Sequence, residues 1–178
     1  ELKHRVYEAN MLLPQYGLVT FTWGNASELD QKRGIFAIKP SGVDYSSMCP
    51  EQMVVTDLSG TVVEGELRPS SDLLTHLELY RSFAGVGAVV HTHSPYATAR
   101  AQAELDLPCY GTTHADSFYG AIPCTRHLTK QEVDQAYEAN TGLVIAETFR
   151  HRKLDPMAIP GVLVCKHGPF SWGANCKK

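Results

Sequence analysis

The chain has 178 residues, a length that suits one domain. Hydrophobic residues make up 43% of it and charged residues 20%, which excludes disordered, collagen-like and coiled-coil chains. The formal net charge is -3 and there is no basic tract, so we expect no nucleic acid partner. No apolar run approaches the roughly 20 residues that cross a bilayer, and the first residues lack the apolar stretch of a signal peptide. These features, with five scattered cysteines that favour reduced thiols, predict a cytoplasmic protein without membrane contact.

Residues 1–63 are predicted to hold one helix and four strands. Apolar residues at helical spacing predict a helix over residues 2–13, ended by Pro14. Asp57 to Gly60 has the composition of a hairpin turn, which favours antiparallel pairing of the strands beside it. The predicted strands are short β-branched or aromatic runs at residues 18–22, 35–38, 53–56 and 61–63.

The rest of the chain is predicted to hold three helices and two strands. A helix over residues 73–83 follows residues that cap free backbone N–H groups, and a capping box of Thr129 with Glu132 opens a later helix. The remaining elements are a strand at 88–93, a helix at 96–103 and a last strand at 161–166. This mixture predicts an α/β (α+β) fold with a mainly antiparallel sheet, as one continuous domain over residues 1–178.

Two histidines stand two residues apart at the end of an apolar strand. Successive side chains of a strand alternate faces, so His91 and His93 are expected on the same side, where both can bind one ion. Imidazole suits zinc, and a catalytic zinc site uses three protein ligands. His167 is the best third ligand because it also ends an apolar strand. His76 suits the site and a structural hydrogen bond equally, whereas Cys165 suits a buried structural role. Since the chain has eight histidines, the spacing is equally compatible with chance.

Three short segments have the composition of a phosphate cradle. Glycine turns, helix starts, Ser hydroxyls and one Lys together bind a dianion. The cradle residues are Gly24, Asn25, Lys39, Ser41, Gly42, Ser70 and Ser71. Each segment alone is also typical of an ordinary turn or helix cap. A further polar segment ends at Asp116, which suits a general acid or base and equally suits the cap of a turn.

Seven short motifs occur in order between about Leu2 and Gly173. The motifs are Leu18-Val19-Thr20 with Thr22-Trp23-Gly24-Asn25, Ile38-Lys39-Pro40-Ser41-Gly42-Val43, Pro69-Ser70-Ser71-Asp72, His91-Thr92-His93-Ser94, Gly111-Thr112-Thr113-His114-Ala115-Asp116, Ile122-Pro123-Cys124-Thr125-Arg126, and His167-Gly168-Pro169-Phe170 with Trp172-Gly173. Together they are similar to the motifs of the class II aldolase and epimerase family. Within that family the chain resembles the L-ribulose 5-phosphate 4-epimerases.

The resemblance implies a three-layer α/β/α sandwich around an antiparallel sheet, assembled as a homotetramer with active sites between neighbouring subunits. The implied zinc ligands are His91, His93 and His167, with Asp72 beside the metal. The family's phosphate contacts fall on the cradle residues and its catalytic aspartate on Asp116. Glu138 falls at an acidic position that the resemblance implies to matter across the subunit boundary.

The implied reaction interconverts L-ribulose 5-phosphate and D-xylulose 5-phosphate, as in arabinose or ascorbate degradation. The proton at C4 is not adjacent to the C2 carbonyl, so the resemblance implies zinc-assisted cleavage and re-formation of the C3–C4 bond. Asp116 is the expected proton carrier on one side. The other carrier is a tyrosine of the family's C-terminal segment, which has no counterpart before Lys178, so we expect that segment to be missing from this sequence.

Three alternatives remain at this point. An aldolase of the L-fuculose 1-phosphate type belongs to the same family, but family aldolases carry Glu where this chain has Asp72. A non-catalytic scaffold built on the same fold is disfavoured because all three histidines are retained. A cupin-type metal barrel also uses a His-x-His pair and a later His, but the helices at both ends of the strand region argue against it.

Overall fold

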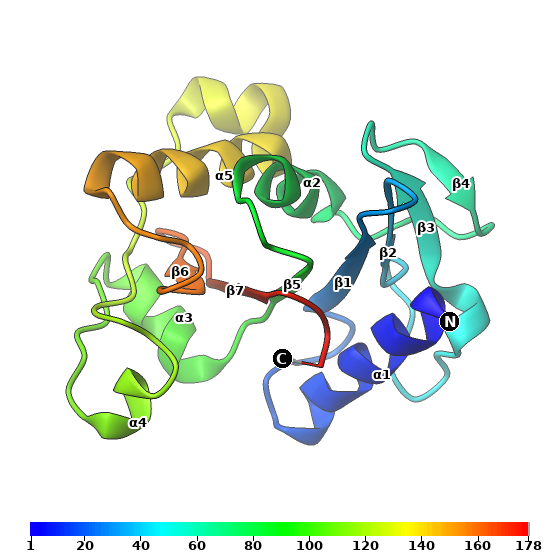
Figure 1. Ribbon diagram of the computed structural model, residues 1–178, viewed down its shortest axis with the longest axis horizontal. Coiled ribbons are helices and arrows are strands. Elements are labelled where there is room, and N and C mark those ends of the chain that lie inside the picture. Colours follow the sequence, from blue (N-terminus) through cyan, green and yellow to red (C-terminus); the bar gives the residue numbers. More distant parts are fainter. Residues whose placement is uncertain (178) are drawn as a thin grey trace.

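A computed structural model describes residues 1–177 as a seven-stranded sheet covered by helices (Figure 1). The strand order is β4-β3-β2-β1-β5-β7-β6, and all neighbouring strands run antiparallel. The strands are β1 (Asn25–Asp30), β2 (Ile35–Ile38), β3 (Val54–Asp57), β4 (Val62–Glu64), β5 (Ala88–His91), β6 (Gly161–Leu163) and β7 (Pro169–Gly173). The helices are α1 (Leu2–Gln15), the 3-10 helix η1 (Pro50–Gln52), α2 (Leu73–Ser82), α3 (Pro95–Gln102), α4 (Thr112–Ala115) and α5 (Lys130–Arg152).

Helices cover both faces of the sheet, so the expected three-layer arrangement is confirmed. In Figure 1, α2 and α5 lie above the strands and α1 lies below them. Side chains along β2 alternate between the two faces, which sends Phe36 and Ile38 into the core under α2 and α5 and Ala37 into the core under α1. No helix of residues 1–177 is long and apolar enough to cross a membrane.

The strand predicted at 18–22 is wrong, because the chain turns there. Phe21 has a φ of 54°, in the left-handed region that no strand uses, and the Trp23 N–H donates to the Thr20 carbonyl oxygen at 3.1 Å. The first strand begins at Asn25 instead. The other strands predicted in the first half lie within a residue of β2, β3 and β4.

The end of the chain contains a strand that the sequence pattern did not predict. The last predicted strand stops at Leu163, three residues earlier than expected, and the chain then turns back as β7. Phe170 and Trp172 of β7 are buried while Ser171 is exposed, which is the alternation of a half-covered strand. The Gly and Pro residues that punctuate this segment concealed the alternation.

A close crossing of α2 and α5 fixes where α5 meets the sheet. Gly142 of α5 has no side chain to separate the helices: a Cβ added there would lie 2.5 Å from the Glu78 Cβ and 3.0 Å from the Thr75 carbonyl oxygen. The Thr75 hydroxyl also donates to the Glu138 carbonyl oxygen at 2.7 Å. The start of the second half of α5 is therefore held against α2.

We expect Gly142→Ala to destabilise the protein, although Ala favours helices by about 1 kcal/mol over Gly. The added methyl group must push the two helices apart, and such overpacking costs about 1–3 kcal/mol. Thermal unfolding of the variant should show a lower Tm than the parent protein. Gly111→Ala is the matched control, because a Cβ at Gly111 meets nothing within 4 Å. Equal Tm values for the Gly142→Ala variant and the parent would contradict the close crossing.

Candidate active site

Nearly all of the predicted site residues line one pocket of about 270 Å³ at the end of the sheet. The predicted residues in its wall are Gly24, Asn25, Lys39, Ser41, Gly42, Ser70, Ser71, Asp72, His91, His93, Glu138 and His167. Thr22, Trp23, Pro40 and Tyr137 complete the lining. The structure thus brings the candidate metal ligands and the candidate phosphate cradle, which are far apart in the sequence, to a single cavity.

The three histidine rings converge from different elements. His91 is the last residue of β5, while His93 lies beyond the strand end and His167 lies in the turn between β6 and β7. One nitrogen of each ring lies within 4.8 Å of the others. The Nε2 atoms of His91 and His93 are 3.1 Å apart. Two ligands of a tetrahedral zinc ion, each about 2.0–2.1 Å from it, are separated by roughly 3.3 Å, so this spacing fits a metal.

The hydrogen bonds on the far side of two rings also fit metal binding. The His91 Nδ1 lies 2.9 Å from the Pro169 carbonyl oxygen, which can only accept, so Nδ1 carries the proton and Nε2 holds a free lone pair. The His167 Nδ1 lies 3.0 Å from the Tyr137 hydroxyl oxygen, which leaves Nε2 of that ring for a metal. Metal-ligating histidines are usually held in this way by a partner on the other ring nitrogen.

Burial keeps the three imidazoles neutral. It lowers the pKa of His91 well below its usual value, and the neighbouring His167 lowers it further. Burial likewise lowers the pKa of His93 and of His167, although the Asp72 carboxylate opposes the shift in both. Neutral imidazole is the form that binds metals, so the three rings suit zinc or another divalent transition metal.

Strand pairing places the cradle beside the histidines. Asn25 at the start of β1 is paired with His91 at the end of β5. The turn before it requires glycine, since Gly24 has a φ of 75° and an added Cβ would lie 3.0 Å from the His91 carbonyl oxygen. An antiparallel bridge between Pro40 and Pro69 places the segment of Lys39 to Gly42 beside the segment that contains Ser70 and Ser71.

Lys39 is a buried cation at the base of the cradle. The residue is only 2% exposed, and its ammonium donates to the carbonyl oxygens of Val43, Thr22 and Pro40 at 3.0, 3.2 and 3.4 Å. Burial lowers its pKa, while the charge of Asp44 opposes that shift. Carbonyl oxygens carry only partial charges, so the ammonium retains an electrostatic preference for an anion in the pocket.

Asn25 links the cradle to the metal side of the pocket. Its Nδ2 donates to the Ser70 hydroxyl at 3.0 Å and to the Asp72 carboxylate at 2.7 Å. Its Oδ1 is buried and has no hydrogen-bond partner within residues 1–177. A buried acceptor without a partner is costly, so this oxygen suits a donor group of a bound ligand. Asp72 lines the same pocket, but it does not belong to the group of three histidines whose nitrogen atoms lie within 4.8 Å of one another.

Asp116 does not line the pocket. It follows α4, is exposed, and belongs to the α3–α5 connection, which lies at the lower left of Figure 1. The short helix Thr112–Ala115 stands where a loop was expected, and Asp116 ends it. Within one chain the candidate proton carrier is therefore separate from the candidate metal ligands.

Sequence reasoning missed Tyr137 and gave no role to Trp23. Tyr137 is half-buried, and burial raises its pKa, so its hydroxyl keeps its proton. The Trp23 ring lies 5.6 Å from the His93 ring, centre to centre. Trp23 belongs to a matching motif, which was a usable signal. No local pattern marked Tyr137, because its position depends on a bend in α5 that neither Pro nor Gly announces.

The other metal-ligand candidates have different partners. His76 is buried, and its Nδ1 lies 2.7 Å from the Ser27 hydroxyl. Cys165 lies with Glu104 and His127 in a separate group, in which the Glu104 carboxylate is already paired with Lys166 at 2.5 Å. Neither His76 nor Cys165 lines the pocket. This agrees with the structural role predicted for Cys165, and of the two roles considered for His76 it favours the structural hydrogen bond.

Comparisons with known proteins agree with the fold. The family described as Class II Aldolase and Adducin N-terminal domain matches residues 4–178. An L-fuculose 1-phosphate aldolase is 27% identical with a TM-score of 0.79, over 98% of this chain and 76% of that chain. The L-fuculose-1-phosphate aldolase from Thermus thermophilus is 25% identical with a TM-score of 0.73, over 98% of this chain and 80% of its own.

A further solved structure supports the fold alone. YgbL from Escherichia coli, described as a candidate aldolase/epimerase/decarboxylase, is 23% identical with a TM-score of 0.75, over 99% of this chain and 80% of its own. The family match covers nearly the whole chain, and the seven-stranded antiparallel sheet agrees with the fold of these relatives. The protein belongs to the class II aldolase and adducin N-terminal domain family.

Proposed function

We propose that the protein is a zinc-dependent L-ribulose-5-phosphate 4-epimerase. The observation that carries this proposal is the meeting of three neutral imidazoles and a buried lysine in one pocket. Such a pocket can bind one small ligand at both ends, with a divalent cation at one end of the ligand and its phosphate ester in the cradle at the other. Family membership and two fuculose-phosphate aldolases among the relatives support an enzyme of sugar phosphates.

The zinc ligands in this proposal are His91, His93 and His167, with Asp72 beside them. Bound there, zinc would supply Lewis-acid polarisation of the C2 and C3 oxygens of the ketose. Inversion at C4 needs this assistance, because the C4 proton is not adjacent to the carbonyl and the C3–C4 bond has to break instead.

The cradle binds the phosphate throughout the reaction. The hydroxyls of Ser41, Ser70 and Ser71 donate hydrogen bonds to it, and the Lys39 ammonium exchanges its long contact with the Pro40 carbonyl oxygen for the phosphate. Asn25 and Gly42 line the cradle beside them. The glycolaldehyde phosphate formed on cleavage therefore stays in the pocket, where its aldehyde can rotate and present the other face for re-addition.

A neighbouring subunit supplies the proton carrier in this proposal. Asp116 lies outside the pocket of its own chain, on an exposed connection, so it can act only on another chain's site or after a large movement. A cyclic homotetramer, as the family resemblance implies, repeats one heterologous interface around a ring, and each interface can bring an Asp116 to a neighbour's histidines.

An L-fuculose-1-phosphate aldolase is the second candidate, favoured by the similarity to two such enzymes. The discriminating residue is Asp72, where family aldolases carry Glu. The shorter carboxylate is held by the 2.7 Å hydrogen bond from Asn25 beside the histidines. This difference supports the epimerase.

The decisive experiment gives the zinc-loaded protein, expressed from its complete gene, both substrates in parallel. We expect D-xylulose 5-phosphate from L-ribulose 5-phosphate and no dihydroxyacetone phosphate from L-fuculose 1-phosphate. The opposite pair of results would replace the epimerase by the aldolase. Absence of both products, together with no bound metal in the purified protein by elemental analysis, would indicate the non-catalytic scaffold.

A further inference from the structure

We infer that Tyr137 is a positioning residue that holds the ring of His167 in the orientation for metal binding. A bend in α5 brings Tyr137 to the pocket, and Arg126 stabilises that bend. The inference rests on the proposed metal centre. It adds to that centre an outer partner for one ligand and assigns a role to Arg126, which belongs to a conspicuous motif but lies outside the pocket.

Tyr137 is the hydroxyl partner that the structure gives to His167. The two atoms, Tyr137 Oη and His167 Nδ1, are 3.0 Å apart, and the rings are 6.0 Å apart. When Nε2 keeps its lone pair for the metal, Nδ1 carries the proton, and the Nδ1–H group donates a hydrogen bond to the tyrosine oxygen. His91 has the corresponding partner in the Pro169 carbonyl oxygen. Tyr137 thus does for His167 what a backbone carbonyl does for His91.

A bend in α5 brings Tyr137 to this place. Ala136 has a φ of -163° and a ψ of 74°, which interrupts the helix directly before Tyr137. The Asn140 side-chain amide donates to the Glu132 carbonyl oxygen at 2.8 Å and so satisfies an acceptor across the interruption. Because the helix restarts at Tyr137, this side chain belongs to the first turn of the second segment, at the edge of the pocket.

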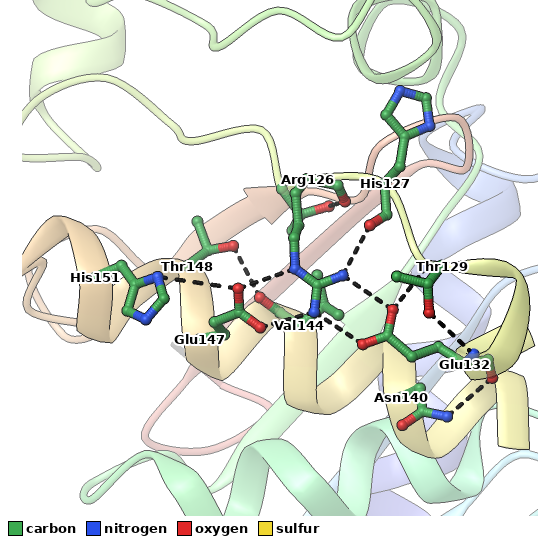
Figure 2. Close-up of polar contacts among 10 residues, drawn as sticks. Arg126, His127, Thr129, Glu132, Asn140, Val144, Glu147, Thr148 and His151 are labelled. Carbon is green, nitrogen blue, oxygen red and sulfur yellow. Dashed lines mark hydrogen bonds and ion pairs between the residues drawn. The ribbon is translucent and has the colours of Figure 1, made fainter.

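Arg126 connects the two segments of α5 across the bend, as Figure 2 shows. Its guanidinium donates twice to Glu132, before the bend, at 2.8 and 2.9 Å. It also donates twice to Glu147, after the bend, at 2.8 and 2.9 Å. Arg is suited to this role because its planar fork can bind two carboxylates at once, which a Lys ammonium cannot match in geometry.

The second segment is also fixed to α2 at the same point. The Thr141 hydroxyl donates to the Tyr137 carbonyl oxygen at 2.8 Å, and the Thr75 hydroxyl of α2 donates to the next carbonyl, that of Glu138, at 2.7 Å. The first of these bonds lies within α5, and the second attaches the residue after Tyr137 to α2. A side chain on such a rigid element can restrict the His167 ring to one orientation.

Zinc affinity of Tyr137→Phe tests the inference, measured by competition with a chromophoric chelator. Loss of an outer partner typically weakens metal binding roughly 10- to 100-fold, and we expect a loss in that range. Tyr16→Phe is the matched control, because Tyr16 is 71% exposed and does not line the pocket. We also expect the visible absorption of the cobalt-substituted Tyr137→Phe protein to differ from that of the parent, since the freed His167 ring changes the ligand field.

Three outcomes separate the possibilities. Parental zinc affinity and an unchanged cobalt spectrum in Tyr137→Phe would overturn the positioning role, even if turnover fell. Failure of the parent protein to bind zinc would overturn the proposed function and this inference together. Arg126→Lys tests the brace: it should weaken zinc binding without altering any pocket residue, and undiminished zinc affinity in that variant would refute the brace.

Discussion

His93→Asn should be purified without zinc and should not epimerise L-ribulose 5-phosphate. The Nε2 of His93 faces that of His91 at 3.1 Å, and Asn is too short to place a donor at the same point. Zinc affinity should fall by more than the roughly 100-fold that loss of an outer partner causes. Elemental analysis of the purified variant checks the metal content, and an enzyme-coupled assay of D-xylulose 5-phosphate checks turnover.

Asp116→Asn is the paired variant, and it should keep its zinc while losing turnover. The reason is that Asp116 lies outside the pocket that holds the three histidines. A mutation that removes a proton carrier lowers kcat without removing the metal. Equal metal loss in both variants would refute this division of roles.

Mixing the two inactive variants should restore activity if Asp116 acts across a subunit boundary. In a mixed ring, a subunit of the Asp116→Asn variant keeps its His93 and can receive an intact Asp116 from a neighbouring subunit of the His93→Asn variant. With equal amounts of the two variants placed at random, about a quarter of the sites contain both intact residues. Unfolding and refolding the two variants together, with each variant refolded alone as the control, gives the measurement. No activity from mixed rings whose composition is verified by mass spectrometry would contradict the shared site.

Lys39→Met should raise the KM for the phosphorylated substrate by about 10- to 100-fold, because a charge-assisted hydrogen bond contributes about 1.5–3 kcal/mol. The Tm should also fall, because Met leaves the carbonyl oxygens that accept from the Lys39 ammonium without a donor.

Inorganic phosphate gives an independent measurement of the same effect. It should raise the Tm of the parent protein, since a ligand that binds only the folded state stabilises it, and should not raise that of Lys39→Met. Lys32→Met is the matched control, because Lys32 is exposed and lies outside the pocket. An unchanged KM and an unchanged phosphate response in Lys39→Met would remove Lys39 from the proposed cradle.

The expected elements were largely correct where a local pattern was continuous. The capping box of Thr129 and Glu132 does open α5, and both of its hydrogen bonds form. Prediction failed where the backbone departs from its periodic pattern. The left-handed φ of Phe21 ends an apparent strand, and the interruption at Ala136 has no sequence signal.

The candidate site was predicted in its donor types but only partly in its geometry. His91 and His93 were expected to share a strand face, yet β5 ends at His91, and His93 reaches the same point from the following loop. Asp116 lies outside the pocket of its own chain, so its role as proton carrier at a site between subunits stays a prediction. Residue type and motif fix what chemistry a side chain can do, whereas the path of the backbone fixes where it does it.

The amino-acid sequence by itself determined the chemical inventory of this protein: imidazoles for a divalent cation, a lysine and serines for a phosphate, and the motifs that indicate the family. The tertiary structure alone decided that Asn25 lies opposite His91, that Lys39 is buried, and that Tyr137 contacts His167. The physical reason is that periodicity and capping act over a few residues, while these contacts depend on the pairing of distant strands and on the crossing of α2 with α5.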